Sequence, residues 1–188
     1  MSVMFSTSKG AWMKRTALYL ILIGLTLIPI RLAATDVTLN NMVVKAYFSP
    51  DGGALKAITR QIDQAVREVL VQSYVMTSKP IESALANAYR RGVEVEVIFD
   101  RNEQKERKYV TSKRLKARGV QVWLDDRHAL SHNKIIIIDR KTVITGSFNF
   151  TYAAEARNAE NLLIIPYAEL AGLYTDNFLA HRRHSAKY

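Results

Sequence analysis

Beyond residue 42, the hydrophobic positions follow two spacings that predict strands and helices in alternation. Short runs rich in Val, Ile and Leu, or alternating with polar residues, predict strands. These runs cover 43–48, 69–75, 93–99, 120–124, 135–138, a return strand that starts at Val143, and 160–165. Apolar residues at helical spacing, bounded by Gly or Pro, predict helices. The helices cover 54–67, 78–91, the second half of 101–118, and a C-terminal segment marked by 170–178 that ends near 181–184.

This alternation predicts an α/β fold with helices on both faces of one sheet. Residues 135–138 are consecutive isoleucines, too apolar for a strand with one solvated face. The polar segment 139–142 has the composition of a tight turn. The strands on either side of it should therefore pair as an antiparallel hairpin, which makes the sheet mixed. Residues 151–157 are predicted to form a loop or a short helix.

The first 34 residues have a different pattern. A basic start at 13–15 precedes an apolar run at 17–30, and Leu32-Ala33-Ala34 offers a cleavage site. This layout is typical of a secretory signal and predicts an exported protein, periplasmic or secreted. The alternative is a membrane anchor over residues 17–34, although Arg31 interrupts that run. The predicted organisation is a leader at 1–34 and one folded domain at 35–188.

The charge of the chain favours a polyanionic partner. The formal net charge is +10, and the leader holds four basic residues and no acids, which leaves +6 for residues 35–188. A basic domain suits nucleic acid or an anionic membrane surface equally. Cysteine is absent, so a disulfide framework, a thiol nucleophile and a Cys-based zinc site are excluded.

The predicted hairpin carries the candidate chemistry at its open end. With Arg140 and Lys141 at the tip, Lys134 should face Ser147 across the strands, and His132 should face Asn149. Residues two apart share a face, so these four side chains should converge on one patch. Asp139 has the opposite parity and lies at the far end of its strand. It is predicted to be structural, capping the turn or pairing with a nearby cation.

A phosphate group fits the chemistry of this patch. His132 can attack phosphorus, Lys134 can offset negative charge, and Ser147 and Asn149 can bond phosphoryl oxygens. Gly146 allows close approach of backbone or ligand. The alternative is an ordinary hairpin with a few polar residues at its open end and no catalytic role.

The spacing His-x-Lys-x4-Asp-x6-Gly-Ser-x-Asn resembles the signature of the phospholipase D superfamily. It is matched at every fixed position by His132, Lys134, Asp139, Gly146, Ser147 and Asn149. Because it has a single copy of the motif, a short chain and a leader, the sequence is most similar to small bacterial endonucleases of the Nuc type. The resemblance covers roughly residue 43 to the C-terminus.

The resemblance implies an α/β/α sandwich and a phosphodiesterase that works through a phosphohistidine on His132, with no metal and no cofactor. Two motif copies meet in one active site in that family, so a chain with one copy should act as a homodimer with a composite site. A glutamate at about the distance of Glu160 bonds the nucleophilic histidine in the family, which assigns that role to Glu160. A surface glutamate at the start of a strand is the alternative.

Several alternatives stay open from the sequence. The substrate is DNA, RNA or, as the rival within enzymes, an anionic phospholipid such as cardiolipin; a binding module with incidental catalysis is a third class. The basic segment 101–118 is either a solvated face or the wall of a substrate groove. Adjacent Asp125 and Asp126 should point apart and favour no metal site. His128 is a rival acid/base group, whereas His181 and His184 are predicted to be basic surface residues.

Overall fold

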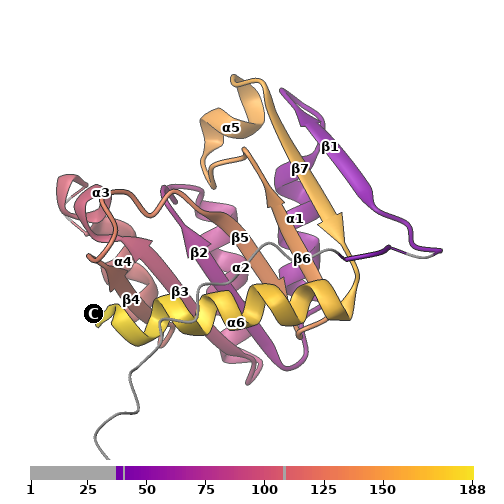
Figure 1. Cartoon of the computed structure of the whole chain (residues 1–188). Helices are drawn as coiled ribbons and strands as arrows, with labels where there is room; N and C mark the ends of the chain where they lie inside the picture. Colours follow the sequence, from indigo (N-terminus) through magenta and orange to yellow (C-terminus); the bar gives the residue numbers. More distant parts are fainter. Residues whose placement is uncertain (1–36, 40, 108) are drawn as a thin grey trace, which may run out of the picture. The chain divides into compact units, whose positions relative to one another are not determined.

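The computed structural model describes residues 37–39, 41–107 and 109–188. The predicted leader lies outside these residues. The described part forms an eight-stranded mixed sheet in the order β1-β7-β6-β5-β2-β3-β4-β8 (Figure 1). Strands β2, β3 and β4 run parallel to one another, and β5, β6, β7 and β1 continue the sheet in antiparallel pairs. The mixed α/β fold is therefore confirmed.

The element bounds follow the predicted alternation. The strands are β1 Lys45–Ser49, β2 Glu68–Ser73, β3 Glu94–Asp100, β4 Gln121–Asp125, β5 Lys134–Ile138, β6 Thr142–Gly146, β7 Glu160–Ile165 and β8 Ala186–Lys187. The helices are α1 Ala54–Asp63, α2 Lys79–Arg90, α3 Arg101–Glu106, α4 Val110–Lys116, α5 Tyr152–Ala156 and α6 Ala168–His184. In the described part of the chain, no helix is both long enough and apolar enough to span a membrane.

Two cores hold the layers together. The larger packs α1, α2, α4 and α5 on one face of the sheet, with Ile58, Leu85 and Phe99 fully buried. The smaller packs α6 on the other face, where Phe178 meets Leu70 and Ile137. The isoleucines of β5 alternate between the two cores, which explains why this strand has no polar face.

One predicted helix ends earlier than expected, and two short elements were not predicted. Helix α1 stops at Asp63, four residues before the predicted end, because residues 64–67 form the turn into β2. The helix predicted in the second half of the basic segment 101–118 is present as α4, and a second short helix, α3, in the first half was not predicted. Strand β8 was not predicted, because two residues that pair only with Trp123 and Leu124 leave no periodic pattern.

The predicted register of the hairpin was also wrong, by one residue. Ile138 pairs with Thr142 and Ile136 with Ile144, so the tip comprises residues 139–141. Asp139 and Arg140 both adopt positive φ, 53° and 52°, and the Lys141 amide donates to the Ile138 carbonyl at 2.9 Å. Two consecutive residues with positive φ are the geometry of a type I′ turn, and Lys141 is an additional residue in the loop. This residue shifts every cross-strand pair.

The topology directs many polar residues to one edge of the sheet. Parallel strands β2, β3 and β4 end at this edge, β5 and β7 begin there, and β6 ends there, as the paired registers show. Ser73, Asp100 and Asp125 end their strands at this edge, whereas Lys134 and Glu160 begin theirs. We call it the polar edge.

Candidate active site

His132 lies two residues before β5 begins, at the middle of the polar edge, and it is exposed. Its ring lies 4.6 Å from the ring of Tyr74, centroid to centroid, at an interplanar angle of 53°. The Tyr74 amide donates to the Asn133 carbonyl at 2.9 Å, so the segment after β2 and the segment before β5 are joined next to the imidazole. The histidine is thus supported on one side and open to solvent on the other.

Lys134 is buried, with 6 % of its surface exposed, and its ammonium is held close to His132. Its Nζ donates to the His132 carbonyl oxygen at 2.6 Å and lies 5.2 Å from the centroid of the Tyr74 ring. Burial lowers the pKa of Lys134, and the negative charge of Glu160 partly opposes that effect. A poorly hydrated cation beside an exposed imidazole is suited to hold an anionic phosphoryl group.

Gly146 and Ser147 lie where β6 approaches β7. The Ser147 amide donates to the Asn161 carbonyl at 3.1 Å, and the Ser147 hydroxyl oxygen accepts from the Asn161 backbone and side-chain amides at 3.0 and 3.3 Å. A Cβ on Gly146 would lie 2.2 Å from the Asn161 carbonyl oxygen, so a glycine is required for this approach. Ser147 is therefore held by Asn161 of β7, and the observed register does not pair it with Lys134 as predicted. The sequence did not predict a role for Asn161, because no motif in its strand indicates the contact with Ser147.

Asn149 is positioned by a clamp between two loops. The Phe150 amide donates to the Val75 carbonyl at 3.1 Å, and the Phe150 carbonyl accepts from the amides of Thr77 and Ser78 at 3.0 Å. The Asn149 side-chain oxygen is buried and makes no hydrogen bond within the described residues. This oxygen is an acceptor, so a phosphoryl oxygen would have to be held by the amino group of the same side chain. The clamp, and not a cross-strand pair with His132, brings Asn149 to this edge.

Glu160 starts β7 and lies close enough to Lys134 to influence its pKa. Its Oε1 accepts from the Asn158 side-chain amide at 3.1 Å. No hydrogen bond joins Glu160 to His132 within the described part of the chain. The contact expected from the family resemblance is thus not formed in this arrangement, and the orienting role of Glu160 stays a prediction.

Asp139 lies at the opposite end of β5 from this cluster. Its Oδ1 accepts from the amides of Arg67 and Glu68 at 2.7 and 3.0 Å, and its Oδ2 accepts from the Val66 amide at 3.1 Å. Burial would raise the pKa of Asp139, but these backbone bonds outweigh burial and hold the pKa below its usual value. The carboxylate fastens the hairpin tip to the turn that precedes β2.

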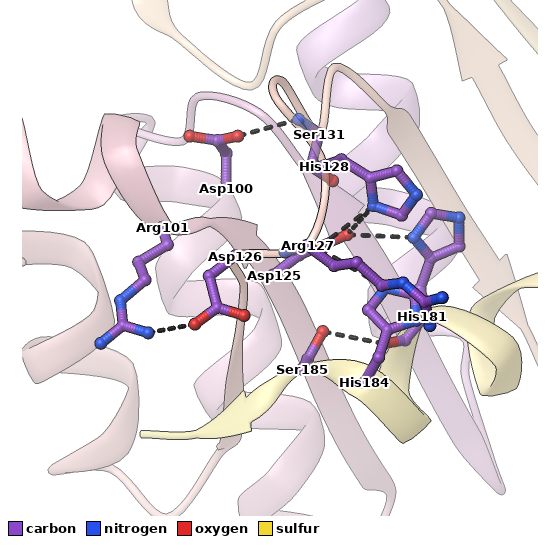
Figure 2. Close-up of polar contacts among 10 residues, drawn as sticks. All are labelled: Asp100, Arg101, Asp125, Asp126, Arg127, His128, Ser131, His181, His184 and Ser185. Atoms are coloured by element: carbon purple, nitrogen blue, oxygen red, sulfur yellow. Dashed lines mark hydrogen bonds and ion pairs between the residues drawn. The ribbon is translucent and has the colours of Figure 1, made fainter.

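A second polar cluster surrounds Asp125, the last residue of β4 (Figure 2). The carboxylate is fully buried, and imidazole nitrogens of His128, His181 and His184 lie 2.9, 3.1 and 3.5 Å from its oxygens. Burial would raise the pKa of Asp125, but hydrogen bonds from His181, His128 and the Arg127 amide hold it at about 2. The prediction that His181 and His184 are surface residues is wrong: only 17 % and 20 % of their side chains are exposed.

The adjacent carboxylates do point apart, as predicted. Asp126 pairs with Arg101, and Asp125 faces the histidines (Figure 2). His128 bonds with Asp125 and belongs to this second cluster. The spacings Asp125-x2-His128 and His181-x2-His184 could have indicated this cluster. The sequence did not predict it, because 52 residues separate the two pairs.

The basic segment 101–118 is partly neutralised by acids. Arg101 pairs with Asp126, Arg107 with Glu103, and Arg114 with the buried Glu82 at 2.5 Å. Lys116 lies 5.2 Å from the centroid of the Tyr188 ring. Some of the basic side chains in this segment are therefore engaged in contacts within the fold. Its role toward substrate stays a prediction.

Comparison with known proteins defines the class. The family model described as "Cardiolipin synthase, PLD-like domain" matches residues 58–182. The chain belongs to this phospholipase D-like family and is a phosphodiesterase of that superfamily.

Its relatives carry two kinds of name. It is 46 % identical over 136 residues to a protein named Phospholipase D from Rickettsia felis, covering 72 % of this chain and 68 % of that one. The crystal structure of Nuc, a phospholipase D family member from Salmonella typhimurium, superimposes with a TM-score of 0.75 at 31 % identity, covering 78 % of this chain and 97 % of Nuc. The mouse Mitochondrial cardiolipin hydrolase is 33 % identical over 105 residues, covering 56 % of this chain and 47 % of that protein.

Proposed function

We propose that this chain is a sequence-nonspecific endonuclease that cleaves DNA, with RNA as a second nucleic-acid substrate, through a phosphohistidine on His132. One observation carries the proposal: His132 is exposed at an open sheet edge with an aromatic ring beside it. A polymer backbone can cross such an edge without entering a cavity, and Tyr74 can stack against a base. The charge of +6 on residues 35–188 suits a nucleic acid, and it suits an anionic lipid surface equally, so it does not choose between the two substrates.

In the proposed reaction, an imidazole nitrogen of His132 attacks phosphorus and forms the P–N bond as the P–O bond to the leaving oxygen breaks. Lys134 and the side-chain amino group of Asn149 hold the phosphoryl oxygens, and Ser147, held by Asn161, contributes its hydroxyl. Glu160 accepts the other imidazole N–H once substrate orders the site, which fixes the tautomer. Water then attacks phosphorus and releases His132.

A lipid phosphodiesterase is the second candidate. The names of the Rickettsia and mouse relatives favour it, because a phospholipase D and a cardiolipin hydrolase cleave phosphodiesters in lipids. The chemistry at His132 would be the same for either substrate. We also propose that the leader at 1–34 directs export or anchors the enzyme, as its basic start and apolar run predict.

Assays of one preparation of the full chain on plasmid DNA, RNA and cardiolipin vesicles should separate these candidates. In excess EDTA, DNA nicking should persist, because Lys134 supplies the positive charge at the attacked phosphate. Matched His132→Ala protein controls for contaminating nucleases. Turnover of cardiolipin alone would identify the lipid enzyme, and DNA binding without cleavage would identify a binding module. Loss of activity in EDTA with rescue by Mg²⁺ would contradict the mechanism.

We further propose that the active unit is a homodimer with one composite site. One imidazole cannot attack phosphorus and protonate the leaving oxygen in the same step, because the two groups lie on opposite sides of the phosphorus. The chain carries the signature once, so the acid would be His132 of a second subunit related by a two-fold axis.

Mixing wild-type and His132→Ala chains tests this arrangement. With equal amounts refolded together and random pairing, activity per total dimer should fall to about a quarter, because only wild-type pairs hold both histidines. If each subunit worked alone, with His128 as the acid, activity would fall only to about half. A value near half, or a fully active monomer, excludes the composite site.

A further inference from the structure

We propose that Asp125, His128, His181 and His184 form a binding site for a divalent transition-metal ion of the Zn²⁺ class, which fastens helix α6 to the loop that carries His132. Three of the four histidines in the sequence meet around one carboxylate here. Asp125 ends β4, His128 lies in the loop after it, and His181 and His184 lie in the last turn of α6 (Figure 2).

The four side chains are close enough to converge on a four-coordinate ion after small rotations. Tetrahedral Zn²⁺ has bonds of about 2.0–2.2 Å to nitrogen and oxygen, which places neighbouring ligand atoms roughly 3.3–3.5 Å apart. Asp125 Oδ2 lies 2.9 Å from His128 Nδ1 and 3.1 Å from His181 Nδ1, and Asp125 Oδ1 lies 3.5 Å from His184 Nε2. All four ligand atoms lie within 4.8 Å of one another. Small side-chain rotations would bring them to a common centre.

The hydrogen bonding within the cluster is incomplete in a way that points to a ligand. His184 Nε2 is buried and lies 3.5 Å from Asp125 Oδ1, but it makes no hydrogen bond of normal geometry within the described residues. Its ring centroid lies 5.1 Å from that of His128 and 5.3 Å from that of His181, so the three rings converge. A cation at the centre would accept one lone pair from each imidazole and neutralise the buried carboxylate of Asp125.

The position gives the ion a structural role that is separate from phosphodiester cleavage. Strand β4 is three strands away from β5 in the sheet, which is roughly 14 Å at the usual strand spacing. The loop between them is already tied near His132, where the Asp100 carboxylate accepts from the Ser131 amide at 2.8 Å. An ion at Asp125 and His128 would tie the beginning of the same loop to α6.

Metal content and thermal stability of the tag-free full chain test the site without any substrate. An equimolar amount of Zn²⁺ should stay bound through gel filtration in metal-free buffer, and saturating Zn²⁺ should raise Tm by roughly 5–10 °C. Mg²⁺ should give no shift, because imidazole ligands disfavour it. Co²⁺ in place of Zn²⁺ should give the intense visible bands of a four-coordinate complex.

Two pairs of variants locate the ion. Asp125→Asn and His184→Ala should abolish Zn²⁺ binding and the Tm shift, whereas Asp126→Asn, which alters the neighbouring carboxylate paired with Arg101, should keep both. His132→Ala should also keep both. Because Asp125 is buried and its variant can unfold, His184→Ala is decisive once its circular dichroism matches wild type. An unchanged Tm in wild type would mean a metal-free hydrogen-bond network, and undiminished Zn²⁺ on His184→Ala would place the ion elsewhere. Either result overturns the site.

Discussion

Replacing His132 with alanine should lower phosphodiester cleavage by about 10³-fold or more while the chain stays folded. The expected loss is large because covalent catalysis has no route without its nucleophile, and Lys134 and Asn149 would then hold a phosphate that nothing attacks. The fold should survive because the His132 side chain is exposed and its main contact is the Tyr74 ring. The stability cost should be about 1 kcal/mol or less.

The intermediate offers a second measurement on the same residue. Acid quenching would destroy a phosphohistidine, whereas alkaline quenching should preserve a covalent nucleic acid–protein adduct on a denaturing gel. The adduct should be missing from His132→Ala. An adduct that survives in acid, or that persists in this variant, would assign the nucleophile to another residue.

Replacing Asp139 with alanine should destabilise the fold by about 2–3 kcal/mol, a fall in Tm of roughly 5–10 °C. The variant removes the acceptor for the amides of Val66, Arg67 and Glu68 and places alanine at a φ of 53° that favours Asp or Asn. Residual activity of the folded fraction should stay near wild type, because Asp139 lies at the far end of β5. A fully stable but inactive variant would contradict this placement.

Asp139→Asn is the matched control. It keeps the preference for positive φ and one oxygen acceptor but removes the charge, so its loss should be smaller. The lowered pKa of Asp139 means that the charged form stabilises the folded state above the usual carboxyl pKa of about 4. That contribution disappears as the pH falls through the folded-state pKa. The stability difference between wild type and Asp139→Asn should therefore shrink on acidification, and a difference that stays constant would refute it.

The hairpin shows which structural features the local sequence pattern predicts and which it does not. Four isoleucines predicted a strand buried on both faces, and the structure places them in two cores. The register depended on which residues adopt positive φ at the tip, and the composition of Asp139-Arg140-Lys141 does not decide this. Lys141 enters the loop, and every predicted pair moves by one residue.

The candidate site shows a similar division. Four signature residues, His132, Lys134, Ser147 and Asn149, predicted phosphate chemistry at the polar edge, because their types and spacing suit a phosphate. The role of Asn161 and the clamp between Phe150 and Val75 depend on hydrogen bonds between strands and loops that no local spacing encodes.

By itself, the sequence determined the alternation of strands and helices and the mixed sheet, and it predicted which residues handle a phosphodiester, because these depend on side-chain type and short-range periodicity. Only the tertiary structure decided the hairpin register, the partner of Ser147, and the convergence of His181 and His184 on Asp125. The last of these joins residues 56 positions apart. Helix α6 packs on the face of the sheet opposite α1 and α2, and its last turn reaches the end of β4, so a contact that looks remote in sequence becomes a direct one in space.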